Sequence, residues 1–259
     1  MADILQAIKA IIDNTIPDIV SYSQGKNRIN SAGDALEDFI KDIFSEALKD
    51  SDLTLKNKKY SEAFSYIGNQ NNPPDIILKN GDAIEVKKIE SLKSSIALNS
   101  SYPKSKLYFD EPMITNSCRN CEDWQEKDII YAIGVVKEKK LQLLWLIYGD
   151  CYAADREIYQ RIRNKINSGI TEIPNVEFSE TKELGRVNKV DPLGITYLRI
   201  RGMWGIKNPV VVYDYLFENL DINTFKLIVV MKEEKYLSFP YEKRMLLEGI
   251  SNQNFTIRK

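Results

Sequence analysis

The feature that most constrains the fold is a hairpin signal in the first third of the chain. Two β-rich runs, residues 75–79 (DIILK) and 83–89 (AIEVKKI), are separated by Asn-Gly-Asp at 80–82. An Asn-Gly pair between such runs is typical of a tight β-hairpin turn. The sequence therefore predicts two directly paired antiparallel strands, around which the rest of the fold must be built.

Charged side chains are predicted on one face of this hairpin. Glu85 and Lys87 are two residues apart on one strand, so their side chains leave the same face. Asp75 joins them only if the loop has odd length: with a three-residue loop at 80–82, Asp75 lies opposite Lys87, whereas a two-residue loop turns it away. A shared site thus requires an odd loop or a bulge.

An amphipathic helix precedes the hairpin. Residues 33–50 (GDALEDFIKDIFSEALKD) carry apolar side chains at the spacing of one helix face. At about 100° per residue, Glu37 falls inside the apolar arc, whereas the neighbouring aspartates fall outside it. We therefore expect one acid of this helix to point towards the interior.

The absence of histidine narrows the chemistry. The 259 residues contain no histidine and three cysteines, which excludes Ser-His-Asp and Cys-His nucleophiles and His-ligated zinc. Cys118 and Cys121 lack the second pair that a zinc site needs. Three cysteines also build no disulfide framework, which favours a reducing, cytoplasmic location.

Carboxylates, a lysine and a hard metal ion remain for hydrolysis. Two carboxylates on one face suit Mg²⁺, which takes oxygen ligands and keeps several waters beside a substrate phosphate. A lysine next to them can orient or deprotonate the attacking water, and desolvation is expected to lower its pKa. The alternative is a solvated polar strand face, because a pattern as short as P-D-x9-E-x-K recurs by chance.

The remaining elements predict an α/β fold with a central mixed sheet flanked by helices. No linker-like segment divides the chain, so residues 1–259 are expected to form one domain. Further strands are predicted at 127–136, 141–148, 196–201, 210–215 and 225–231, and further helices at 151–166 and 241–248.

These residues carry a family resemblance. The helix with its acid and the hairpin with D and E-x-K resemble the PD-(D/E)xK nuclease core. More closely, four segments resemble the NgoPII-type family of type II restriction endonucleases: NRINSAGDALEDFIKDIF at 27–44, PPDIILKNGDAIEVKKIES at 73–91, ALNSSYPKSKLYFDEPMITNSCRNCEDW at 97–124 and KDIIYAIG at 127–134.

The resemblance implies a restriction-endonuclease-like core and Mg²⁺-dependent cleavage of double-stranded DNA at a short palindrome, GGCC in the family's namesake. It implies a cognate DNA methyltransferase as functional partner. Carried over by position, Asp75 and Glu85 become the metal ligands, Lys87 the catalytic lysine and Glu37 an accessory acid. Because a palindrome is matched by a two-fold protein, we expect a homodimer.

Candidate DNA contacts follow from local charge. The net charge of −1 hides two basic segments, 86–109 and 182–207, which could face phosphates. Arginine is the natural reader of guanine, with asparagine on neighbouring base edges. The alternative is a salt-bridge ladder on a solvated strand face for Arg199 and Arg201, and a loop surface charge for Arg119. The candidates are Lys88, Lys93, Lys104, Asn116, Arg119, Arg199 and Arg201.

Two rival functions remain at this point. A PD-(D/E)xK repair or structure-selective nuclease would use the same residues without reading bases. A non-catalytic DNA-binding protein would carry Asp75, Glu85 and Lys87 as an ordinary strand surface. No apolar run in the sequence is long enough for a membrane span, so no membrane partner is expected.

Overall fold

The hairpin lies in the middle of a mixed seven-stranded sheet. The computed structural model of the chain describes residues 2–14, 31–69, 72–138, 140–181, 183–217, 220 and 223–250. The strand order is β1-β2-β3-β6-β7-β12, with β5 paired to β6. The strands are β1 (Phe64–Asn69), β2 (Asn72–Leu78), β3 (Ala83–Ile89), β5 (Lys106–Tyr108), β6 (Glu126–Lys137), β7 (Lys140–Tyr148) and β12 (Lys226–Val230).

The sheet mixes both pairing directions, as predicted. β1, β2 and β3 are antiparallel neighbours, β3 runs parallel to β6, β6 is antiparallel to β7, and β7 runs parallel to β12. Successive side chains of β6 and β7 alternate between two apolar clusters, one on each face of the sheet. The α/β class is thereby confirmed.

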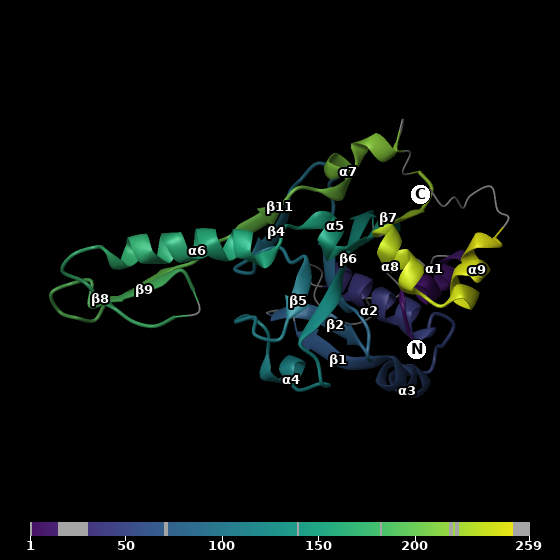
Figure 1. The fold of residues 1–259 in the computed structure, drawn as a ribbon, viewed down its shortest axis with the longest axis horizontal. Coiled ribbons are helices and arrows are strands. Elements are labelled where there is room, and N and C mark those ends of the chain that lie inside the picture. The colour runs from purple at the N-terminus through teal and green to yellow at the C-terminus, as the bar shows by residue number, and fades with distance from the viewer. Residues whose placement is uncertain are drawn as a thin grey trace.

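Helices cover one face of the sheet (Figure 1). The cluster there joins apolar side chains of the first two helices, the last helix and the even-numbered residues of β6 and β7. The helices of this layer and its edge are α1 (Ile4–Ile12), α2 (Ser31–Ser45), α3 (Leu53–Ala63), α8 (Glu233–Ser238) and α9 (Tyr241–Glu248).

Short elements and connecting segments cover the opposite face. The apolar cluster on this side includes Trp124, Trp145 and Tyr213. The elements are β4 (Ile96–Asn99), which pairs with β11 (Trp204–Ile206), and the helices α4 (Asn116–Arg119), α5 (Gly149–Tyr152) and α7 (Pro209–Val212).

A glycine sets how closely α2 approaches the sheet. A Cβ added at Gly134 of β6 would lie 2.7 Å from Cδ2 of Leu36. A larger residue at 134 would therefore force the side chain of Leu36 to shift. The glycine thus allows Leu36 of α2 to pack directly against β6.

An arm projects from the body of the molecule (Figure 1). It consists of α6 (Arg156–Thr171) and a three-stranded sheet of β8 (Glu177–Phe178), β9 (Gly185–Asn188) and β10 (Leu198–Ile200) in the order β10-β9-β8. Asn167 Nδ2 donates to the carbonyl of Leu184 (2.7 Å), which ties the helix to the small sheet. We call residues 156–201 the arm.

Two secondary-structure predictions need correction. Residues 210–215 are not a strand: Pro209–Val212 is helical and Asp214–Leu216 forms a 3₁₀ turn. The predicted helix at 151–166 is broken, because α5 ends at Tyr152 and α6 begins only at Arg156. The predicted helix at 241–248 and the strands at 196–201 and 225–231 are present within one or two residues.

Among the described residues, no helix is both long and apolar enough to cross a bilayer.

Candidate active site

The hairpin has the odd register that a shared site requires. Ile76 pairs with Ile84 and Ile77 with Ala83, so the turn centres on Asn80, which adopts a φ of 52°. Asp75 therefore stands opposite Glu85. The predicted odd loop length is confirmed. The predicted cross-strand partner of Asp75 is wrong: it is Glu85, two residues before the expected Lys87.

The acids lie where the two strands separate. The β2–β3 pairing ends at Ile76 and Ile84, so Asp75 and Glu85 are the first residues beyond the ladder. The backbone N–H of Val86 is free of the ladder and donates to Asp75 Oδ2 (2.6 Å). Lys87 Nζ donates to Glu85 Oε1 (2.5 Å), and the charges of Glu85 and Lys87 both act on Asp75, so the three predicted side chains lie together.

Burial and mutual charge shift the pKa values of Asp75 and Lys87. Burial and the negative charge of Glu85 raise the pKa of Asp75 well above its usual range. For Lys87, burial acts to lower the pKa, but the carboxylates of Glu85 and Asp75 outweigh it, so the net pKa is raised. The prediction that desolvation lowers the pKa of Lys87 is therefore wrong.

Glu37 lies within electrostatic range of the group. Its charge contributes to raising the pKa of both Asp75 and Lys87. The side chain is 24% exposed and pairs with Nζ of Lys41 at 2.9 Å. Lys41 lies one helical turn further along α2 and was not predicted as a site residue. Its spacing of four residues from Glu37 could have indicated this ion pair.

The donor set fits a hard divalent cation. Glu85 Oε2 is buried and has no hydrogen-bond partner among the described residues, and buried carboxylate oxygens are normally satisfied. No group of three or more His, Cys, Asp or Glu side chains in the described part could hold a metal ion. A cation bound here would have at most two protein carboxylates, Asp75 and Glu85, and would need water or phosphate oxygens for the rest, a donor set of the kind that Mg²⁺ accepts.

Comparison with known proteins places the chain in a family. The sequence model of the NgoPII restriction endonuclease family matches residues 2–259. The chain belongs to this family. It is 49% identical over 245 residues to the type II restriction enzyme NgoPII of Neisseria gonorrhoeae, covering 94% of this chain and 88% of that protein. No solved structure matches the chain.

Membership in the NgoPII family confirms the activity class predicted from the sequence, a type II restriction endonuclease. It favours this function over a repair nuclease and over a non-catalytic DNA-binding protein. Double-stranded DNA is accordingly the substrate class, and a divalent metal ion is the cofactor class of such enzymes.

The basic segment at 86–109 is largely neutralised by tertiary contacts. Lys104 is the clearest correction: its side chain is 3% exposed and its Nζ bonds Glu111 Oε2 at 3.0 Å, so it cannot reach a phosphate in this structure. Lys93 is exposed and has no ion pair within the described residues. The other paired lysines are Lys87 with Glu85, Lys88 with Glu90, and Lys106 with Glu126.

Asn116 and Arg119 serve the loop that carries them. Arg119 donates to the carbonyls of Phe109 (3.1 Å), Ile114 (3.1 Å) and Glu111 (2.5 Å), and to Asn116 Oδ1 (3.2 Å). A guanidinium with this many internal acceptors holds the loop together. To read a base, Arg119 would have to give up some of these bonds.

Arg199 and Arg201 share one carboxylate on the arm. Glu183 Oε1 lies 2.6 Å from Nη2 of Arg199 and 2.6 Å from Nε of Arg201. This arrangement is the salt-bridge alternative weighed from the sequence. Both arginines remain about half exposed. Lys182, counted in the same basic segment, lies outside the described residues.

A buried polar network beside the site was not anticipated. Tyr102 Oη donates to Glu111 Oε1 (2.7 Å), and Lys104 bonds the other oxygen of the same carboxylate. The backbone N–H of Lys104 donates to Tyr131 Oη (2.7 Å), and Tyr131 is the sheet neighbour of Glu85. Only the fold brings these residues together, so no local pattern could indicate them.

Proposed function

We propose that this chain, as a single domain, is a Mg²⁺-dependent endonuclease that cleaves both strands of duplex DNA through Asp75, Glu85 and Lys87. The observation that carries the proposal is the buried Glu85 Oε2, which has no hydrogen-bond partner among the described residues. The other oxygen of the same carboxylate, Oε1, accepts from Lys87 Nζ, and Asp75 lies opposite on the neighbouring strand. A partly buried pair of acids and a lysine at the open end of a hairpin fits phosphodiester hydrolysis without histidine.

Each residue has a role in this scheme. Asp75 and Glu85 hold the ion, which when bound polarises the phosphate and favours ionisation of water. Glu85 Oε1 fixes Lys87 Nζ, so that the ammonium points at the reacting phosphate, where it orients the attacking water and offsets the charge that develops in the transition state. The Val86 N–H holds Asp75 in position through Oδ2.

Glu37 is proposed as an accessory group. Its pairing with Lys41 keeps both side chains near the site. In this position Glu37 holds a second-layer water or orients Lys87. Replacement of Glu37 by Gln is therefore expected to weaken cleavage less than replacement of Asp75 or Glu85.

Digestion of one sequenced plasmid tests the proposal. With Mg²⁺ the protein should give discrete bands whose mapped ends share one short palindrome; the family resemblance suggests GGCC. Without divalent metal no cleavage should occur. A smear, or a preference for branched DNA, would support a repair or structure-selective nuclease. A protein that binds DNA and never cuts it would contradict the catalytic assignment.

We further propose that the enzyme acts as a homodimer in the cytoplasm, alongside a methyltransferase that protects the host site. A two-fold protein matches a palindrome and places one site on each strand. Sedimentation of the protein on a duplex with one site should give two chains per duplex. One chain per duplex would exclude concerted cleavage by a dimer.

A further inference from the structure

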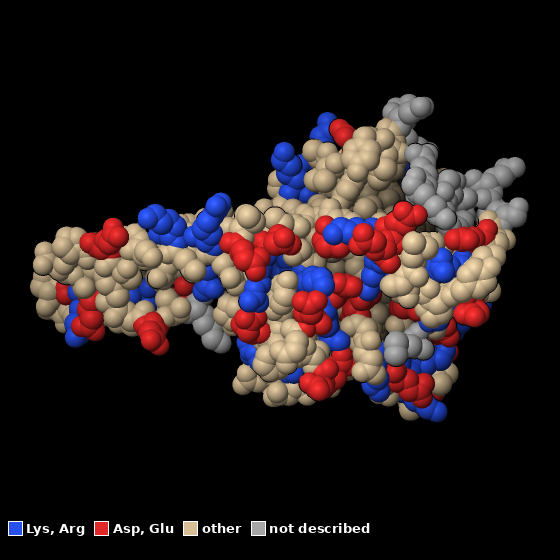
Figure 2. Space-filling model, in the orientation of Figure 1, with Lys and Arg blue, Asp and Glu red and all other residues tan. Residues whose placement is uncertain are grey.

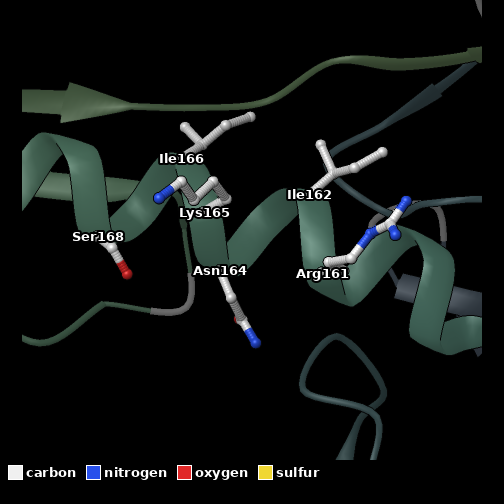
Figure 3. Close-up of a pocket in the computed structure, with 6 residues that line it drawn as sticks. All are labelled: Arg161, Ile162, Asn164, Lys165, Ile166 and Ser168. Atoms are coloured by element: carbon white, nitrogen blue, oxygen red, sulfur yellow. The ribbon is translucent and has the colours of Figure 1, made fainter.

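Helix α6 of the arm carries a stripe of hydrogen-bond donors without an acid. Four exposed side chains at helix positions i, i+3, i+4 and i+7 share one side of the helix: Arg161, Asn164, Lys165 and Ser168. They line a shallow hollow along the helix, beside Ile162 and Ile166 (Figure 3). We call these four residues the α6 stripe.

The two cations of the α6 stripe are unpaired in the part of the chain that the structure describes, although two exposed acids lie one turn beyond its ends: Glu157, which is 3.7 Å from Arg156 Nε, and Glu172. Neither Arg161 nor Lys165 forms an ion pair within the described residues, whereas the cations of the two basic segments are mostly paired. Arg156, at the start of the helix, is engaged with Asp110 through two bonds of 2.6 and 3.1 Å. Lys and Arg side chains accordingly gather along the arm over α6 (Figure 2).

The helix leaves the body of the molecule next to the active site. The ring of Tyr159 stacks on Tyr102 with centroids 5.3 Å apart, and Tyr102 shares the carboxylate of Glu111 with Lys104. Burial lowers the pKa of Lys104, and the charges of Glu85 and Arg163 both act on it. The buried network therefore lies between the catalytic strand β3 and the side of α6 that carries Tyr159 and Arg163, whereas the α6 stripe lies on the solvent-exposed side of the same helix.

We propose that the α6 stripe binds the sugar–phosphate backbone of the duplex held at the active site. Arginine, lysine, asparagine and serine are the side chains that commonly contact phosphate oxygens, and such contacts position a protein on DNA without reading its sequence. The two half-exposed isoleucines flank the stripe and supply an apolar border. The inference rests on the proposed function only for the identity of the substrate.

The stripe adds a sequence-independent component to binding. Each neutralised phosphate contributes about 0.9 to the slope of log affinity against log salt concentration for duplex DNA. Arg161 and Lys165 together should therefore account for about 1.8 of that slope. Recognition of the palindrome itself should not depend on them.

The test measures binding of a duplex of about 30 base pairs in EDTA, over a range of salt concentrations. EDTA prevents cleavage, so the result is independent of the proposed metal site. Arg161→Gln/Lys165→Gln should bind more weakly than wild type and lower the slope by about 1.8. The charge-retaining variant Arg161→Lys/Lys165→Arg should keep the wild-type slope, and thermal unfolding should be the same for all.

The matched control removes two exposed lysines on the opposite side of the body. Lys49, between α2 and α3, and Lys58, on α3, have no ion pair within the described part of the chain; α3 lies far from the arm in Figure 1. Lys49→Gln/Lys58→Gln makes the same change in net charge and should leave the slope unchanged.

Two outcomes would overturn the proposal. The first is that Arg161→Gln/Lys165→Gln has the same slope of log affinity against log salt concentration as wild type. The second is that its slope falls by no more than that of the control variant. A stripe variant that loses dimerisation in sedimentation while its slope is unchanged would assign the surface to a second copy of this chain. If the stripe variant lowers the slope as predicted but the wild type never cuts DNA, the proposed function is refuted and this inference stands.

Discussion

At the scale of single residues, Asp75 is the side chain of the site whose ionised form is most disfavoured in the folded protein. Its carboxylate lies close to that of Glu85 in a buried setting, so the neutral form is favoured in the folded protein without a cation. Such a raised pKa means that ionised Asp75 opposes folding at neutral pH. The stabilising contact from the Val86 N–H only partly offsets this.

Replacement of Asp75 by Asn should therefore stabilise the metal-free protein by roughly 1–3 kcal/mol at pH 7, because Asn keeps the acceptor for Val86 and removes the charge. Thermal unfolding in EDTA measures this. Added Mg²⁺ should raise the Tm of wild type and not that of Asp75→Asn. A variant less stable than wild type in EDTA would contradict the account.

Replacement of Lys87 by Ala should reduce Mg²⁺-dependent cleavage by roughly 100-fold or more, since it removes the group that orients the water and offsets transition-state charge. Single-turnover cleavage measures the chemical step, and duplex binding in EDTA should change little. Lys79→Ala is a matched control: Lys79 is an exposed lysine of the same hairpin, whose Nζ bonds the carbonyl of Ser61 (2.5 Å). Equal loss in both variants would remove Lys87 from the mechanism.

At the scale of elements, residues 208–216 show how a buried cap overrides β propensity. The run PVVVY predicts a strand, yet Asn208 Oδ1 accepts from the Val210 N–H (3.1 Å) and Pro209 occupies the first helical position. The Asn208 side chain is buried and its Nδ2 donates to the carbonyls of Ser91 (3.0 Å) and Ser94 (3.3 Å). A remote loop therefore helps to start this helix.

Replacement of Asn208 by Ala should cost about 2–3 kcal/mol, because it removes the cap and leaves two carbonyls without their donor. Urea unfolding measures the change. Asn57→Ala, at an exposed position of α3, should change stability by less than about 0.5 kcal/mol. Equal small effects at both positions would show that Asn208 does not hold the loop.

At the scale of the whole molecule, ion pairs join segments that are distant in sequence. Lys235 of α8 reaches both Asp82 of the hairpin turn (2.9 Å) and Asp128 of β6 (2.6 Å). The Lys104–Glu111 pair is the most buried of these links, with side chains 3% and 2% exposed. Through Tyr102 it also supports the root of the arm.

Replacement of Lys104 by Met should destabilise the protein by about 3–5 kcal/mol, because it leaves the Glu111 carboxylate buried without its countercharge. Lys104→Met/Glu111→Gln should recover more than half of this loss, since Gln keeps an acceptor for Tyr102 and removes the charge. Chemical denaturation of both variants is the measurement. If the double variant is no more stable than the single one, the cost does not come from the unpaired charge.

Features that depend on neighbours along the chain could be predicted from the amino-acid sequence. The hairpin, the common face of Glu85 and Lys87, and the amphipathic helix with Glu37 follow from periods of two and 3.6 residues and from turn chemistry. The absence of histidine directed the chemistry to carboxylates and lysine. The resemblance of long segments to the NgoPII family predicted the enzyme class.

Which charged side chains remain available for DNA depends on the three-dimensional fold. Lys104, Arg119, Arg199 and Arg201 were reasonable DNA contacts by local charge, yet their acceptors come from residues up to 18 positions away and from another turn or strand. That Asp75 lies opposite Glu85 and not opposite Lys87 depended on the hairpin register, in which Ile76 pairs with Ile84. Local composition cannot report these pairings, because electrostatic interactions and hydrogen bonds depend on distances that the complete fold sets.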